Sequence, residues 1–265
     1  MKVLLLTTCI CNNENIKDLK RLIISINRVE KIDFEHIVLL QNSNEYCDAE
    51  LQDLATNYNL KTLKINEIIS LSKARNILID KASELDLFSQ SDFVSFPDDD
   101  CWYPELFWDN FIELEKQENF ELFYTQFSST PVKFTAGNNE HSTTNLVRNA
   151  SSNTSFYKLN LFNNIGSFDE DFGVGAKNNG GEDLDFAIRA LLISQRTYFL
   201  NLPVIGHRDP LPEFRYKYFQ GSFGILNKYK FKSLSLSVNF LRKLAIGIIF
   251  YLQGKIKLTH FKVVT

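Results

Sequence analysis

The sequence predicts an α/β domain in which a mostly parallel, Rossmann-like central sheet is flanked by helices. Short apolar runs alternate with segments whose apolar residues recur at helical spacing, and this alternation fills residues 1–100. Strand–helix–strand units of this kind are right-handed and build parallel sheets. Ligands of such sheets bind outside the carboxyl ends of the strands, so a site is expected there.

Residues 1–100 hold the clearest elements. The mainly apolar run at residues 2–8 is typical of a strand buried on both faces, and apolar residues from Ile16 to Val29 recur at helical spacing. The elements predicted next are a strand at 36–40, a helix at 45–57, a strand at 60–65, a helix from Ser72 to about Leu87 that Ser72 can cap, and a strand at 93–96.

Residues 101–230 are less regular. We expect a helix at 104–119 and a strand at 121–127, followed by a loop at 128–153, which is polar and rich in Ser, Thr and Asn. A glycine-rich stretch then leads into a helix at Glu182, and residues 196–200 form another strand. No internal repeat is present, so residues 1–230 are interpreted as one domain with halves at 1–100 and 101–230.

Composition limits the classes of function. With 265 residues, 44% of them hydrophobic, the chain can bury one large core. The 29 basic residues are balanced by 32 acidic ones, so no basic field favours a nucleic-acid partner. The four cysteines show neither CxxC spacing nor the density of a disulfide scaffold, and the apolar N-terminal run is too short for a signal peptide. These features favour a reducing cytoplasm.

The C-terminal segment 231–265 is predicted to be a helical extension. Leu241–Leu252 is apolar except for Arg242 and Lys243, and several lysines follow it. The uncharged part, 244–252, is far short of the roughly 20 residues that a spanning helix needs, so a helix lying in a membrane interface fits better. The alternatives are a closing helix packed on the domain and a subunit contact in a homo-oligomer.

Three aspartates, Asp98, Asp99 and Asp100, follow the predicted strand at 93–96. In an extended segment, residues two apart point the same way, which aims Asp98 and Asp100 at one point. Clustered carboxylates favour a cation between them, and hard oxygen ligands suit Mg²⁺ or Mn²⁺ bound to phosphates. The alternative is an acidic turn whose last Asp caps a helix near Pro104.

Two further segments carry charge at predicted helix starts. Lys73 and Arg75 lie in a first turn, where the helix dipole disfavours cations unless an anion is near. Glu182 and Asp183 open a later helix after glycines, where acids can simply cap the helix. In a functional interpretation, Asp183 is a base and Glu182 holds a hydroxyl-bearing substrate.

His207, just past the strand at 196–200, is a candidate further metal ligand, although a lone histidine is more often structural.

The order of these motifs resembles glycosyltransferase family 2, whose members are inverting enzymes of the GT-A fold. The resemblance covers residues 2–210 and rests on the Ala74-Arg-Asn76 helix, the Asp triplet, the Phe168-Asp-Glu170 loop, the Gly181-Glu-Asp183 helix start and the strand-end histidine. It implies a nucleotide-binding half at 1–100, an acceptor-binding half at 101–230, and transfer from a nucleotide-diphosphate sugar to a carbohydrate hydroxyl.

The resemblance also implies a role for each residue. Asp98, Asp100 and His207 would hold Mn²⁺ or Mg²⁺, Asp183 would be the catalytic base, and Gly181 and Glu182 would contact the acceptor. Contacts to the nucleotide sugar are implied for Thr8, Asn42, Arg75, Asp98 and Asp99.

One departure bears on the donor. Where family members commonly have an Asp-Gly-Ser-like turn that reads base and ribose, this chain has Gln41-Asn42-Ser43. These residues do not identify the base. The expectation of a UDP-sugar rests on the resemblance to the family. A lipid-linked saccharide acceptor in bacterial surface-polysaccharide assembly would suit the basic-apolar tail.

Two other functions are weighed. A sugar nucleotidyltransferase would need a glycine-rich phosphate loop after the first strand, and Thr7-Thr-Cys-Ile-Cys-Asn12 contains no glycine. An inactive sugar-nucleotide or glycan-binding module is disfavoured because Asp98, Asp100, Asp183 and His207 are all present.

Overall fold

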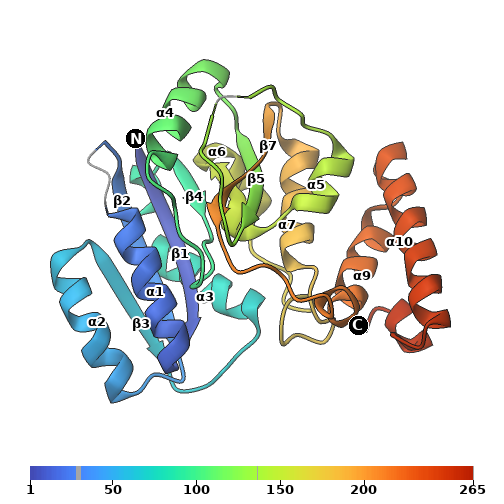
Figure 1. Cartoon of the computed structure of the whole chain (residues 1–265), viewed down its shortest axis with the longest axis horizontal. Coiled ribbons are helices and arrows are strands. Elements are labelled where there is room, and N and C mark those ends of the chain that lie inside the picture. The colour runs from blue at the N-terminus through green and yellow to red at the C-terminus, as the bar shows by residue number, and fades with distance from the viewer. Residues whose placement is uncertain (28–30, 136, 265) are drawn as a thin grey trace.

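The computed structural model describes residues 1–27, 31–135 and 137–264, and its centre is a seven-stranded sheet in the order β3-β2-β1-β4-β6-β5-β7 (Figure 1). Its strands are β1 (Lys2–Ile10), β2 (Asp33–Gln41), β3 (Leu60–Ile65), β4 (Phe93–Ser95), β5 (Leu122–Ser128), β6 (Ser155–Lys158) and β7 (Thr197–Gly206). All neighbouring pairs are parallel except those of β6, which runs antiparallel to both β4 and β5. The predicted mostly parallel sheet is thus confirmed.

Helices cover both faces of the sheet. One buried cluster joins the sheet to α1 (Asn13–Ile26), α2 (Glu45–Asn57) and α4 (Phe107–Glu118), and a second joins it to α3 (Leu71–Glu84), α6 (Leu159–Ile165) and α7 (Glu182–Ile193). Figure 1 shows α1 and α2 in front of β1, β2 and β3. The central strands β1 and β2 are apolar on both faces because both faces are covered.

Several predicted details were wrong. The polar stretch 128–153, expected to be a loop, contains α5 (Thr143–Asn149), whose N-cap Ser142 accepts a hydrogen bond from the Asn145 N–H. Strand β6 and helix α6 were not predicted, because a strand of four residues gives little periodic signal. Ser72 does not cap α3: Ser70 is the N-cap residue, and the Ser72 hydroxyl donates to the carbonyl of Phe172.

A two-residue bridge ties the segment after the aspartates to the end of β7. Trp102 and Gly206 exchange both backbone hydrogen bonds at 2.9 Å, in antiparallel sense. A Cβ atom on Gly206 would lie 2.0 Å from the Trp102 indole, so only glycine fits there. Asp100 lies two residues before Trp102, and His207 directly follows Gly206. The bridge therefore places Asp100 beside His207.

The C-terminal helices form a group at the end of the molecule away from β3 (Figure 1). They are α8 (Phe214–Lys217), α9 (Phe219–Tyr229) and α10 (Leu234–Leu252), and they share an aromatic cluster that includes Phe219, Phe223 and Phe250. The last residues then return to the domain, where the Asn178 side chain bonds to both the N–H and the carbonyl of Val264. The predicted helical extension is confirmed, and it packs on α9 and α5.

Helix α10 is longer than the apolar stretch suggested. Its 19 residues reach a mean hydropathy of 1.4 over an 18-residue window, which by length and composition would suffice to cross a membrane. Only 17% of that window is buried. Arg242 and Lys243 lie near its middle, where charge is costly in a bilayer.

Candidate active site

The three aspartates form a turn at the carboxyl end of β4. The Cys101 N–H donates to the Asp98 carbonyl at 3.1 Å, which closes the turn. The carboxylates of Asp98 and Asp100 therefore converge because the chain turns, and not because an extended strand alternates, as the sequence had suggested. The alternative interpretation, in which the last aspartate caps a helix near Pro104, was wrong: α4 begins at Phe107, and its N-cap residue is Leu106 in the left-handed region.

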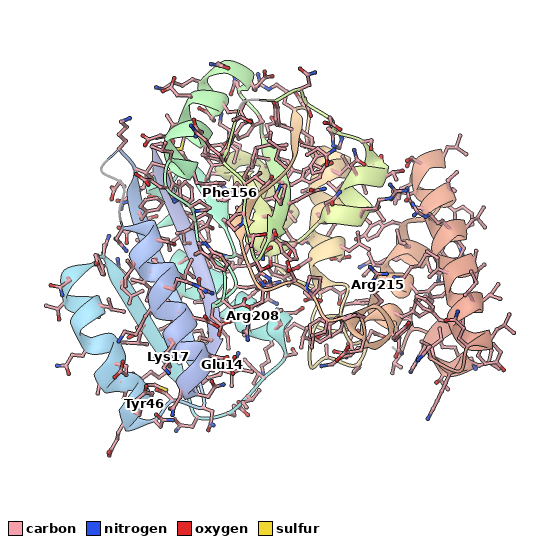
Figure 2. The ribbon with its side chains drawn as sticks, in the orientation of Figure 1. Glu14, Lys17, Tyr46, Phe156, Arg208 and Arg215 are labelled. Carbon is pink, nitrogen blue, oxygen red and sulfur yellow. The ribbon has the colours of Figure 1, made fainter. Side chains whose placement is uncertain are left out.

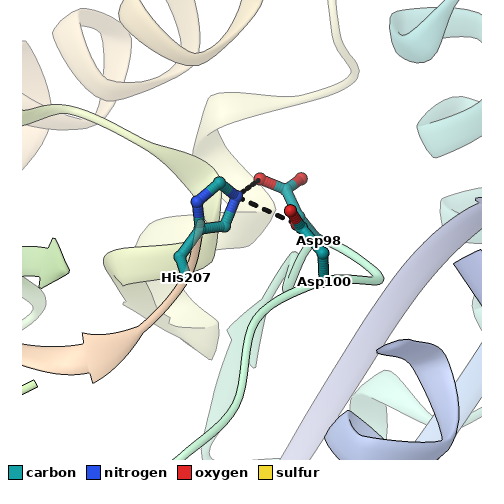
Figure 3. Close-up of side chains that lie close together, drawn as sticks. All are labelled: Asp98, Asp100 and His207. Carbon is teal, nitrogen blue, oxygen red and sulfur yellow. Dashed lines mark ion pairs between the residues drawn. The ribbon is translucent and has the colours of Figure 1, made fainter. Parts of the chain in front are cut away.

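Asp98, Asp100 and His207 meet at one point (Figure 3). The His207 Nε2 lies 3.0 Å from Asp100 Oδ1 and 3.6 Å from Asp98 Oδ2. One ligand atom from each of the three residues lies within 4.8 Å of the others, close enough to hold a metal ion. The structure thus brings together the three residues predicted to bind metal.

The histidine is oriented as a metal ligand requires. Its Nδ1 lies 2.6 Å from the Arg208 carbonyl oxygen, which can only accept, so Nδ1 carries a proton. In the ion-free protein, Nε2 carries the second proton and faces the carboxylates of Asp100 and Asp98. When that proton is lost, the Nε2 lone pair points to the same position, where a metal ion could bind. Two carboxylate oxygens and one imidazole nitrogen fit Mn²⁺ and also Mg²⁺.

Charge in this cluster is balanced by cations. Burial alone would lower the pKa of His207, but hydrogen bonds to Asp100 and Asp98 outweigh it and raise the pKa to about 10. Burial would raise the pKa of Asp100, but hydrogen bonds from His207 and Arg208 outweigh it and lower the pKa to about 2. The Arg208 Nε lies 2.6 Å from Asp100 Oδ2, and Arg208 also approaches Glu14 of α1 (Figure 2).

Asp99 has a different environment. Burial, with the charges of Asp100 and Asp98, raises the pKa of Asp99 to about 7, while a hydrogen bond with Cys9 opposes the shift. Asp99 thus faces the end of β1 and takes no part in the three-residue cluster.

Arg75 joins the aspartates to the start of α7. It is 2% exposed, and its guanidinium donates to Asp183 Oδ1 at 2.7 Å, to Asp98 Oδ1 at 3.3 Å and to the Ser152 hydroxyl. Burial would lower the pKa of Arg75, but the charges of Asp183 and Asp98 raise it. The first-turn cation is therefore neutralised by carboxylates from distant parts of the chain, while Lys73 on the same turn is exposed.

Glu182 and Asp183 open α7, as predicted. Gly181 is the N-cap residue with φ 92°, and a Cβ on it would lie 2.7 Å from the backbone of Gly221 on α9. This close contact fixes the start of the helix. Burial and the charge of Asp183 raise the pKa of Glu182 to about 7, and the Asp183 side chain is 24% exposed. Asp183 is therefore the more accessible of the two acids.

A pocket of about 380 Å³, here called the α7 pocket, lies against these acids. Its lining includes Gly181, Glu182, Asp183, Val174, Arg215 and Lys243. Asp183 thus lines the pocket and also pairs with Arg75, which connects it to Asp98 in the cluster of Asp98, Asp100 and His207.

Two predicted contacts lie at neighbouring strand ends. Thr8 is half-buried near the end of β1, and Asn42 is exposed just after β2 with φ 53°. In the described part of the chain, no side-chain hydrogen bond links either residue to the aspartates.

The structure adds two residues that sequence reasoning missed, Ser152 and Arg208. Ser152 lies in a short 3₁₀ turn after α5, and no local pattern marks it. Arg208 had one available signal, its position directly after the candidate ligand His207.

Together, the mixed sheet, the paired aspartates at a strand end and the acidic helix start define a transferase of the GT-A fold. The chain belongs to glycosyl transferase family 2, whose model matches residues 8–172. Asp183 and His207 lie beyond the matched residues, so their placement rests on the structure. No curated protein matches the chain.

Solved structures share the fold. S. aureus TarS 1-349 in complex with UDP-GlcNAc has a TM-score of 0.65 and 16% identity, covering 92% of this chain and 72% of that chain. A mannosyltransferase from Pyrobaculum calidifontis, PcManGT, in complex with GDP-Man and Mn²⁺, has a TM-score of 0.58 and 14% identity, covering 85% of this chain and 63% of that chain. Against a longer TarS structure, the coverage of that chain falls to 43%. At these identities the likeness shows the fold alone.

Replacing Arg75 by Met is expected to lower the free energy of unfolding by about 3 to 5 kcal/mol, because Asp98 and Asp183 lose a buried partner. Adding Asp183→Asn should recover part of this loss, since it removes one of the unpaired charges. Urea denaturation would measure both effects.

Lys73→Met is the matched control, because Lys73 is exposed on the same helix turn. Its unfolding free energy should stay within about 0.5 kcal/mol of the parent. An equal loss in both variants would show that the ion pairs of Arg75 do not stabilise the fold.

Proposed function

We propose that the chain is an inverting glycosyltransferase that moves a sugar from a nucleotide-diphosphate sugar, specifically a UDP-sugar, to a carbohydrate hydroxyl. The observation that carries the proposal is the connection of Asp183 through Arg75 to the cluster of Asp98, Asp100 and His207. The proposed base and the proposed metal site thus lie on either side of one guanidinium. Family membership favours glycosyl transfer over nucleotidyl transfer.

Asp98, Asp100 and His207 would hold Mn²⁺ or Mg²⁺. The bound ion would supply positive charge to the donor's diphosphate and so stabilise it as a leaving group. The proton on His207 and the guanidinium of Arg208 offset the carboxylate charge in the ion-free protein. Binding the ion through Nε2 would therefore release a proton.

Asp183 would act as the base. As the acceptor oxygen bonds to the anomeric carbon, the bond from that carbon to the diphosphate breaks, and the hydroxyl proton passes to the Asp183 carboxylate. Attack on the face opposite the leaving group inverts the anomeric carbon. Burial and the charge of Asp183 raise the pKa of Glu182, which favours the protonated acid, and this acid would donate a hydrogen bond to the acceptor.

Arg75 would couple binding of the donor's diphosphate to deprotonation of the acceptor. In the structure it is shared between Asp98 and Asp183. The donor's diphosphate would compete with Asp183 for the guanidinium, and the Asp183 carboxylate would then be free to accept a hydrogen bond from the acceptor hydroxyl. Thr8, Asn42, Asp98 and Asp99 are proposed to contact the nucleotide sugar, and Gly181 to border the acceptor.

The proposed setting is bacterial polysaccharide biosynthesis of the capsule, O-antigen or exopolysaccharide type, with a lipid-linked saccharide as acceptor. We propose that the protein lies on the cytoplasmic face of the membrane through α10. This helix exposes an apolar stripe in which Leu234, Leu241 and Leu252 are 82%, 60% and 78% exposed. Arg242 is exposed beside the stripe, and Lys255 and Lys257 follow it, which suits an anionic lipid surface.

Asp100→Asn should weaken binding of Mn²⁺ with UDP by at least about tenfold, because the variant loses an anionic ligand. His207→Ala should cause a smaller loss. Calorimetry with Mn²⁺ and UDP measures both, and Asp80→Asn, on the exposed surface of α3, is the control. If Asp100→Asn binds Mn²⁺ with UDP as tightly as the parent does, the assignment of Asp100 as a metal ligand is wrong.

Asp183→Asn should keep donor binding but slow transfer by about a hundredfold or more, because an amide cannot accept the proton. Glu182→Gln should instead raise the KM for the acceptor. Donor calorimetry and transfer assays at saturating acceptor separate the two defects. If Asp183→Asn transfers at nearly the parental rate, the base is another residue, with Glu182 and Asp185 the candidates.

Replacing both Leu241 and Leu252 by Asp should reduce co-sedimentation with phosphatidylglycerol vesicles, while both side chains are exposed enough for the fold to survive. The control replaces Ile68 and Leu192, which are 60% and 42% exposed on other elements, by Asp. Equal vesicle binding by the parent and both double variants would refute membrane association through α10.

A further inference from the structure

The α7 pocket contains two cations that the proposed chemistry does not use. Besides Glu182 and Asp183, its lining includes Arg215 of α8 and Lys243 of α10. Figure 2 shows Arg215 on the side of the site toward α9 and α10. The cations therefore belong to the C-terminal helices, whereas the acids belong to α7.

The positive character continues beyond this pocket. A second hollow of about 180 Å³ shares Lys243 with the α7 pocket and is lined by Arg148 of α5 and Arg242 of α10, with no acid among its described lining residues. Helices α5, α8 and α10 thus bring four cations to adjoining cavities, although they are far apart in the sequence.

Among the described residues, none is an anionic partner of these cations. Across residues 1–27, 31–135 and 137–264, no carboxylate oxygen lies within 4.0 Å of a side-chain nitrogen of Arg148, Arg215, Arg242 or Lys243. The Lys243 ammonium lies 5.1 Å from the centre of the Phe219 ring, and burial lowers the pKa of Lys243 to about 8. A half-buried ammonium without a counter-ion is costly, and a bound anion would offset that cost.

We propose that the Lys243 side of the α7 pocket is a subsite for an anionic group, a phosphate or a carboxylate, carried by the acceptor, with Lys243 and Arg215 as its contacts. The inference rests on the proposed function, because it takes the pocket beside Asp183 as the place where the acceptor hydroxyl binds. The planar fork of Arg215 can bind either anion through two oxygens, and Lys243 adds a point charge.

The position of the subsite assigns the anion to the acceptor and not to the donor. The donor's diphosphate is assigned to the cluster of Asp98, Asp100 and His207, and Arg75 connects that cluster to Asp183. Lys243 and Arg215 instead line the α7 pocket, which Asp183 also lines. An acceptor that placed its anion there would have its neutral part beside Asp183.

The test compares three phenyl β-D-glucosides that differ only at C6, as the alcohol, the carboxylate and the phosphate. Binding is measured by calorimetry with saturating UDP and Mn²⁺, so that the donor's diphosphate site is filled. We expect at least one anionic compound to bind about tenfold more tightly than the alcohol. Whichever of the two binds more tightly identifies the anion as a phosphate or a carboxylate.

Lys243→Met and Arg215→Gln should each remove most of this preference, whereas Lys232→Met, an exposed lysine outside both cavities, should keep it. Arg215 is exposed, so its variant keeps the test decisive if Lys243→Met does not fold. Equal binding of the three compounds by the parent, or an unchanged preference in both variants, would overturn the subsite.

Two outcomes separate related explanations. If Lys243→Met loses binding to phosphatidylglycerol vesicles but keeps the preference among the glucosides, Lys243 contacts a lipid headgroup and the subsite is refuted. If the parent does not bind UDP with Mn²⁺ and yet shows a preference that depends on Lys243, the subsite stands and the donor assignment of the proposed function fails.

Discussion

The buried guanidinium of Arg75 is the interaction on which the site depends. It takes one carboxylate from the turn after β4 and another from the start of α7, residues that are far apart in the sequence. A buried cation must be paired, and the carboxylates that pair it are themselves held near other acids. The ion pairs therefore link the two ends of the site through one buried side chain.

The acid cluster is held together by backbone geometry as well as by charge. The Trp102–Gly206 bridge places the aspartate turn beside the end of β7, and the indole leaves no room for a side chain at position 206. His207 and Arg208 then follow directly and neutralise Asp100. His207, one of the three candidate metal ligands, and Arg208 thus stabilise the carboxylates of the cluster in the ion-free protein.

The C-terminal helices contribute to the candidate site as well as to an exposed apolar surface. Gly221 of α9 supports the helix start at Gly181, and Val264 bonds to Asn178 in the glycine-rich approach to α7. One face of α10 contributes Lys243 to the α7 pocket, while another exposes leucines. A lipid-linked acceptor would meet both faces at once, which gives a physical reason for joining a pocket and an apolar stripe in one helix.

The sequence by itself determined the parallel half of the sheet, the strand-end aspartates and the acidic helix start, because each depends on local periodicity or on adjacent residues. It did not determine β6, α5, or the partners of Arg75, and it attributed the convergence of Asp98 and Asp100 to strand alternation where a turn produces it. Ser152, Arg208 and the four cations that pair with no carboxylate of the described residues became visible only in the tertiary structure. The reason is physical: local patterns encode which elements form, whereas which charges neutralise one another depends on how those elements pack across long sequence separations.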